Sequence, residues 1–176
     1  MNKQGIRDKA AAVRLLVMDV DGVLTDGSLY FGNQGEELKA FNIRDGLGIK
    51  WLQQAGINTA IITGRRSQLV QNRADNLGIG HVIQGREDKL VALEELCRQL
   101  NIRLDETAYI GDDVQDLTAI HRAGLGCTVA NGDPLVKQYA DWQSDFAGGR
   151  GAVRQLAEFI LDAQQQLAGI HQRYLP

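Results

Sequence analysis

Hydrophobic residues occur along the chain in two alternating patterns, short continuous apolar runs and longer segments with helical spacing. The apolar runs are typical of strands buried on both faces and cover 14–20, 57–63, 81–85, 107–113 and 126–131. The segments with helical spacing cover 45–56, 66–78, 88–100, 114–124 and 151–170. This alternation predicts an α/β fold, with a doubly wound, Rossmann-like parallel sheet covered by helices on both faces.

One segment departs from the alternation. In "GSLYFGNQGEELKAFN", residues 27–42, two short alternating runs flank the turn-forming sequence "GNQGE". Such an arrangement predicts a β-hairpin that protrudes from the sheet.

Composition narrows the class of protein. The chain has 176 residues, 44% of them hydrophobic, and a formal net charge of −3. This length fits a single domain over 1–176, closed by a C-terminal helix and tail at about 151–176. Without a basic cluster we expect neither nucleic acid nor a membrane surface as partner, but a small molecule.

The cysteines and the N-terminus bear on the compartment. Cys97 and Cys127 are the only cysteines, too few for a disulfide framework or a zinc site. Cys97 and Trp51 lie on helical segments and are predicted to pack in the core. No signal peptide or membrane span is apparent, so we expect a cytoplasmic protein.

Polar residues follow the predicted strands where a parallel α/β sheet binds its ligands. They are Asp19 and Asp21, then Thr63 to Arg65, then Asp112 and Asp113, with Lys89 opening the helix after the third strand. Two unit charges 4 Å apart repel by about 4 kcal/mol at an effective dielectric of 20, so gathered carboxylates call for a cation. A hard cation such as Mg²⁺, with a phosphate, suits this set of oxygen ligands.

These residues carry a family resemblance. "DVDGVLTDG", "IITGR", Lys89 and "GDDVQD" resemble, in order, the four motifs of the haloacid dehalogenase superfamily. "GNQGEELKAFNIRDG" and "AGGRGAVR" are similar to segments of its phosphatases of sugar acid phosphates, which lack a cap domain. The resemblance implies a Mg²⁺-dependent phosphatase of an eight-carbon sugar acid phosphate in lipopolysaccharide synthesis, with a nine-carbon substrate as the alternative.

The resemblance also implies roles for the acidic residues. Asp19 would attack phosphorus and form an aspartyl-phosphate, and Asp21 would protonate the leaving oxygen and later deprotonate the attacking water. Mg²⁺ would bind the carboxylates of Asp19 and Asp112 and the backbone carbonyl of Asp21. Asp113 or Asp116 would either bind the metal through water or orient Lys89.

The substrate would be held by groups from several loops. Thr63, the Gly64 amide and Lys89 would bind the phosphoryl oxygens. Three arginines are candidates for contacting the anionic substrate and equally fit solvated charges: Arg65, Arg86 and Arg150.

Assembly is implied because the intervals between the motifs leave no room for a cap domain. The hairpin carries Leu29, Tyr30 and Phe31, which it is too small to bury by itself. The resemblance implies a homotetramer with active sites completed by neighbouring subunits, and the C-terminal "HQRYLP" would reach a neighbour's site. Alternatively, the hairpin folds back on its own domain.

Other functions remain as alternatives. Asp19 or Asp112 alone also fits a turn former or a helix cap, although the presence of all four motifs favours a catalytic role. A phospho-acceptor receiver domain has similar residues, but its lysine follows its acidic pair and acceptor, whereas Lys89 precedes Asp112. A non-catalytic assembly domain is the third alternative, disfavoured because every motif residue is present.

Overall fold

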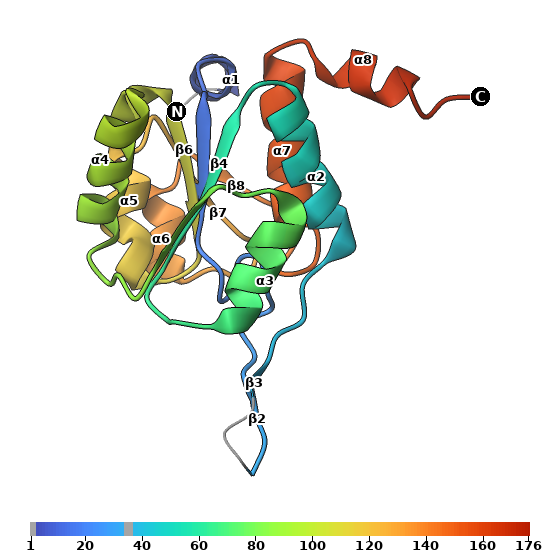
Figure 1. The fold of residues 1–176 in the computed structure, drawn as a ribbon. Helices are drawn as coiled ribbons and strands as arrows, with labels where there is room; N and C mark the ends of the chain where they lie inside the picture. The colour runs from blue at the N-terminus through green and yellow to red at the C-terminus, as the bar shows by residue number, and fades with distance from the viewer. Residues whose placement is uncertain (1–2, 34–36) are drawn as a thin grey trace.

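The computed structural model describes residues 3–33 and 37–176, and a parallel sheet lies at its centre (Figure 1). Within those residues the sheet has six strands in the order β5-β4-β1-β6-β7-β8. Their bounds are β1 Leu15–Met18, β4 Asn58–Thr63, β5 His81–Gln84, β6 Thr107–Gly111, β7 Leu125–Thr128 and β8 Trp142–Gln143. In register, Met18 at the end of β1 lies level with Ile61 and Ile110, so the residues that follow these strands reach one edge.

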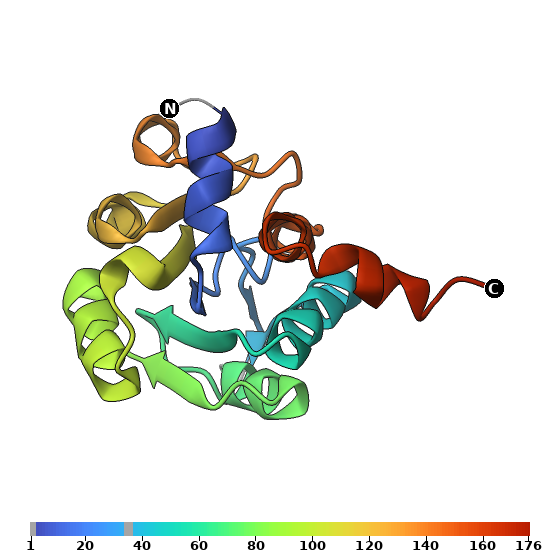
Figure 2. The same cartoon turned by 90° about the horizontal axis from the view of Figure 1, so that it is seen from above.

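Helices cover both faces of the sheet (Figure 2). One layer consists of α1 Lys3–Ala11, α2 Ile43–Gln54, α3 Gln68–Leu77 and α7 Ala152–Ala163, and the other of α4 Lys89–Leu100, α5 Leu117–Arg122 and α6 Pro134–Tyr139. The alternation of β1 shows why both faces are apolar: Leu16 and Met18 enter one core cluster, Leu15 and Val17 the other. The predicted α/β fold is confirmed.

Trp51 and Cys97 are 3% and 5% exposed, which confirms that they pack in the core. Both cysteines are buried and unpaired. No helix in the described part of the chain combines the length and the apolar character that crossing a membrane requires.

The predicted helix at 151–170 is wrong, because it is two helices. Helix α7 ends at Ala163, Gln165 adopts a left-handed φ of 59°, and α8 begins at Leu167 and ends at Gln172. The side chain of Gln164 donates to the carbonyl of Val13 at 2.8 Å, which ties the end of α7 to the loop before β1. A contact with a residue 151 positions away leaves no trace in the local apolar spacing.

Other boundaries also differ from the prediction. The helix predicted at 114–124 begins as a 3-10 turn, η2 Val114–Asp116, and continues as α5. Helix α1, the short helix α6, the edge strand β8 and the 3-10 turn η1 Leu104–Glu106 were not predicted. These elements are short or polar, so their apolar periodicity is weak.

The hairpin consists of β2 Tyr30–Phe31 and β3 Glu37–Leu38 and projects from the carboxyl edge of the sheet (Figure 1). Tyr30 pairs with Leu38 in antiparallel register, and part of the predicted turn, 34–36, lies outside the described residues. Tyr30, Phe31 and Leu38 are 54%, 63% and 65% exposed, so these side chains do not fold back on the sheet.

The intervals that could hold a cap domain are short. That from β1 to β4 contains the hairpin and α2, and that from β4 to α4 contains α3 and β5. The described residues therefore hold no cap domain, as predicted.

Candidate active site

A cleft of about 410 Å³ lies at the carboxyl edge of the sheet. Residues from the loops after β1, β4 and β6 and from the start of α4 line it: Asp19, Asp21, Gly27, Thr63, Gly64, Arg65, Glu87, Lys89, Asp112, Asp113, Gln115 and Asp116. The structure thus brings together all of the predicted catalytic and metal-binding residues, and separates two of the three candidate arginines from them.

Three carboxylates form the floor of the cleft. Oxygen atoms of Asp19, Asp112 and Asp116 lie within 4.8 Å of one another. Burial, together with the charge of Asp116, raises the pKa of both Asp19 and Asp112 to about 7. A divalent cation would offset this repulsion, and an oxygen-only set of ligands fits Mg²⁺.

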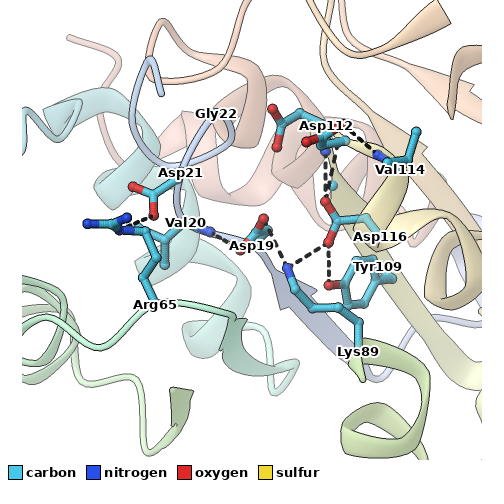
Figure 3. A network of polar contacts seen from close by, with 12 residues as sticks. Asp19, Val20, Asp21, Gly22, Arg65, Lys89, Tyr109, Asp112, Val114 and Asp116 are labelled. Carbon is cyan, nitrogen blue, oxygen red and sulfur yellow. Dashed lines mark hydrogen bonds and ion pairs between the residues drawn. The ribbon is translucent and has the colours of Figure 1, made fainter. Parts of the chain in front are cut away.

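Lys89 bridges the floor of the cleft (Figure 3). Its ammonium lies 3.0 Å from Asp19 Oδ2 and donates to Asp116 Oδ1 at 2.9 Å, and its side chain is only 2% exposed. Burial lowers the pKa of Lys89, but the carboxylates of Asp19 and Asp116 outweigh burial, so the pKa rises. Lys89 therefore stays charged beside the predicted nucleophile.

Asp116 is completely buried and held on both oxygens. Tyr109 donates its hydroxyl to Oδ1 at 2.8 Å, and the Asp112 amide donates to Oδ2 at 3.2 Å (Figure 3). Of the two predicted alternatives, this contact geometry favours Asp116 as the residue that orients Lys89. Asp113 instead accepts a hydrogen bond from the amide of Val114 at 2.7 Å, as the cap of the turn.

A tight turn after β1 presents Asp19. Its Oδ1 accepts from the amide of Val20 at 2.7 Å, and the Leu24 amide donates back to the Val20 carbonyl at 2.9 Å. Gly22 has a φ of +87°, and a Cβ there would lie 2.0 Å from Asp112 Oδ2. Only glycine allows the turn to approach Asp112 this closely.

Asp21 lines the same cleft, but its carboxylate is not part of the cluster of three. It forms an ion pair with Lys39 from the hairpin, and Arg65 Nε lies 3.9 Å from its Oδ2. Because β1 ends at Met18, Asp19 and Asp21 lie in the turn after the strand, where strand alternation does not set the directions of their side chains.

Thr63, Gly64 and Arg65, at the end of β4 and just after it, line the cleft. The other two candidate arginines are not part of its lining. Arg86 donates to Asp88 at 2.7 Å and to Glu95 at 2.9 Å, so helix α4 holds it outside the cleft lining. Arg150 lies 3.3 Å from Asp26 and is also absent from the lining. In both cases nearby carboxylates pair with the guanidinium group, and contact of Arg86 or Arg150 with the substrate stays a prediction.

Sequence reasoning missed Lys39, Tyr109 and Gln115. Tyr109 lies on the buried strand β6, and its hydroxyl group, which needs a hydrogen-bond partner there, was the only indication in the sequence of a role in the site. Lys39 follows a hairpin strand whose sequence is typical of a solvent-exposed segment. Gln115 lies in the motif "GDDVQD", of which only the acidic residues were predicted to act in the site.

This fold and site, with a DxD turn, a strand-end threonine, a buried lysine and an acidic loop at one edge, define a haloacid dehalogenase-like hydrolase. Residues 78–156 match the family model of that description.

Similarity to individual proteins is more specific. The chain is 51% identical over 161 residues, 92% of its length, to the 3-deoxy-D-manno-octulosonate 8-phosphate phosphatase KdsC of Yersinia pestis, 86% of which is covered. It is similar to the crystal structure of the phosphatase of the same name from Moraxella catarrhalis in complex with magnesium, phosphate and KDO, with a TM-score of 0.97, 45% identity, and coverage of 99% and 100% of the two chains. The cobalt-bound phosphatase from Haemophilus influenzae has a TM-score of 0.91 at 38% identity, with 96% and 99% covered. The chain therefore belongs to the family of 3-deoxy-D-manno-octulosonate 8-phosphate phosphatases.

Proposed function

We propose that this chain is a Mg²⁺-dependent phosphatase that hydrolyses 3-deoxy-D-manno-octulosonate 8-phosphate to KDO and phosphate, in lipopolysaccharide synthesis. The observation that carries the proposal is the position of Asp19, a buried carboxylate held between Lys89 and the acidic cluster. The relative from Moraxella catarrhalis, whose structure contains magnesium, phosphate and KDO, supports the choice of metal and sugar.

The reaction follows from the residues in the cleft. Asp19 attacks phosphorus, the bond from phosphorus to the C8 oxygen breaks, and Asp21 gives its proton to that oxygen. Asp21 then takes a proton from the water that attacks the aspartyl-phosphate, which releases phosphate and restores Asp19. Splitting the hydrolysis in this way replaces one difficult step by two easier ones.

Charge in the transition state is balanced by the other residues. Thr63, the Gly64 amide and Lys89 hold the phosphoryl oxygens. Mg²⁺, bound by Asp19, Asp112 and the backbone carbonyl of Asp21, would shield the phosphate from the carboxylates. The ammonium of Lys89, at 3.0 Å from Asp19, keeps the nucleophile facing the cleft.

The proposal includes the assembly and the compartment. Because the described residues contain no cap domain, we propose a homotetramer of single-domain chains in which neighbouring subunits cover each cleft. Buried, unpaired Cys97 and Cys127 suit a reducing cytoplasm.

A substrate panel tests this function. With Mg²⁺, we expect the highest kcat/KM for the eight-carbon sugar acid phosphate, lower values for nine-carbon sugar acid phosphates, and no turnover in excess chelator. Asp19→Asn should lower kcat by at least about 1,000-fold with an unchanged circular dichroism spectrum, because an amide cannot attack phosphorus. A clear preference for a nine-carbon substrate, or full activity in chelator, would contradict the proposal.

A further inference from the structure

We infer that Lys39 is a positioning residue for Asp21, so that the hairpin takes part in catalysis by holding the proposed general acid. The inference rests on the proposed role of Asp21 in phosphate ester hydrolysis. Its starting point is the ion pair between Lys39 Nζ and Asp21 Oδ1, which joins a residue just after β3 to the turn after β1.

The two cations around Asp21 are not equivalent. The side chain of Lys39 is completely buried, whereas that of Arg65 is 46% exposed and its Nε lies 3.9 Å from the carboxylate. A charge-assisted hydrogen bond from a buried ammonium is stronger than a longer, solvated ion pair. Lys39 is therefore the partner that fixes the direction of the Asp21 carboxylate.

The backbone cannot fix that direction by itself. The turn is closed by the amides of Val23, Leu24 and Thr25, which donate to the Val20 carbonyl, but these bonds leave the Asp21 side chain free to rotate. Rotation about χ1 would carry the carboxylate into another staggered well, away from its present place. Proton transfer requires the acid within about 3 Å of the leaving oxygen, and a misplacement of about 1 Å can cost about 100-fold in rate.

The ion pair also couples the hairpin to Asp21. Asp21 precedes β2 and Lys39 follows β3, 18 residues later, so the ion pair closes the base of the projecting hairpin. An ion pair confined to the hairpin would join its two strands to each other. This pair ends instead on a carboxylate that lines the cleft, and so makes the orientation of Asp21 depend on where the hairpin lies.

Leaving-group dependence tests the inference. We would measure kcat and KM of Lys39→Met with a sugar phosphate and with aryl phosphates whose phenols differ in acidity. The expected loss in kcat is about 10- to 100-fold for the sugar phosphate, which needs a proton at its leaving oxygen. It should be less than about threefold for the most acidic phenol. Lys50→Met, which removes the same charge from an exposed position of α2, should leave both activities unchanged.

Double variants separate positioning from a general structural effect. In Asp21→Asn the dependence on phenol acidity should already be steep, and adding Lys39→Met should not steepen it. Lys39→Arg, which keeps the charge, should restore most of the sugar phosphate turnover. Equal losses with all substrates would overturn the inference, as would a further steepening in the Asp21→Asn background. If Lys39→Met proves unstable, Lys39→Gln, which also removes the charge, takes its place in the same measurements.

The same measurements keep this inference distinct from the proposed substrate. A wild-type chain that hydrolyses simple alkyl and aryl phosphates but not the eight-carbon sugar acid phosphate would refute the substrate, while Lys39 would still be tested on the simple esters.

Discussion

At the scale of single residues, the site is governed by the cost of gathering carboxylates. Asp19 and Asp112 both have a pKa raised to about 7 by burial and by Asp116, and Lys89 supplies a buried positive charge between Asp19 and Asp116. Near neutral pH the folded chain therefore keeps these two carboxyl groups partly protonated, and unfolding would release the protons. A cation that binds Asp19 and Asp112 should offset the repulsion between the carboxylates and so raise the free energy of unfolding.

This cost predicts how Mg²⁺ affects stability. A carboxyl group whose pKa is raised on folding stabilises the fold below its unfolded pKa of about 4, and that contribution is lost as the pH rises to about 7. Excess Mg²⁺ should therefore raise Tm more at pH 8 than at pH 5, by at least about 4 °C, measured by calorimetry. Asp112→Asn, as the control, should reduce the difference. Equal shifts at both pH values would show that these carboxylates do not bind the ion.

At the scale of elements, one helix is capped by a side chain of another. Asp45, in the first turn of α2, is 1% exposed and accepts from the amides of Gly151 at 3.3 Å and Arg154 at 2.8 Å, at the beginning of α7. Its charge also faces the positive end of the helix dipole. The contact ties the helix after the hairpin, α2, to the beginning of α7.

We predict that Asp45→Ala lowers the free energy of unfolding by about 2–4 kcal/mol, because the buried amide of Gly151 and the partly buried amide of Arg154 lose their acceptor. Urea unfolding followed by circular dichroism measures this. Asp8→Ala, at an exposed position of α1, should change stability by less than about 0.5 kcal/mol. A similar small effect of Asp45→Ala would mean that water replaces the carboxylate.

At the scale of the whole molecule, the projecting hairpin and the C-terminus lie at opposite ends (Figure 1). The hairpin projects at the cleft end, while Tyr174 in the tail accepts a hydrogen bond from Trp51 Nε1 at 3.2 Å, on the molecule's own α2. The chain therefore does not cover its own cleft with its tail. Entry of "HQRYLP" into a neighbour's site stays a prediction.

The exposed hairpin predicts the effect of Phe31→Asp. Tyr30, Phe31 and Leu38 are exposed apolar residues of the hairpin that a neighbouring hairpin would bury, and a charge in place of Phe31 should dissociate the proposed tetramer. Light scattering should show a lower mass, and sugar phosphate turnover should fall in parallel by at least about tenfold. Val91→Asp, at an exposed position of α4, should change neither the mass nor the turnover. A wild-type monomer with full activity would refute shared sites.

The sequence by itself determined five of the six described strands of the sheet and the residue types at its carboxyl edge. Apolar runs, helical spacing and strand-end residues are local patterns, because a strand buried on both faces must be apolar over its own few residues. Because the carboxyl ends of parallel strands meet at one edge of a sheet, Asp19, Thr63 and Asp112 were expected at the same edge. The register of β1 with β4 and β6 agrees with this expectation.

Only the tertiary structure decided which charges face one another. Arg65 and Arg86 look alike in sequence, yet Asp88 and Glu95 hold Arg86 outside the cleft while Arg65 approaches Asp21. Lys39 reaches Asp21 across a hairpin, and Tyr109 reaches Asp116 across a turn. The partner of a long polar side chain depends on segments distant in the chain, and apolar periodicity carries no information about such pairs.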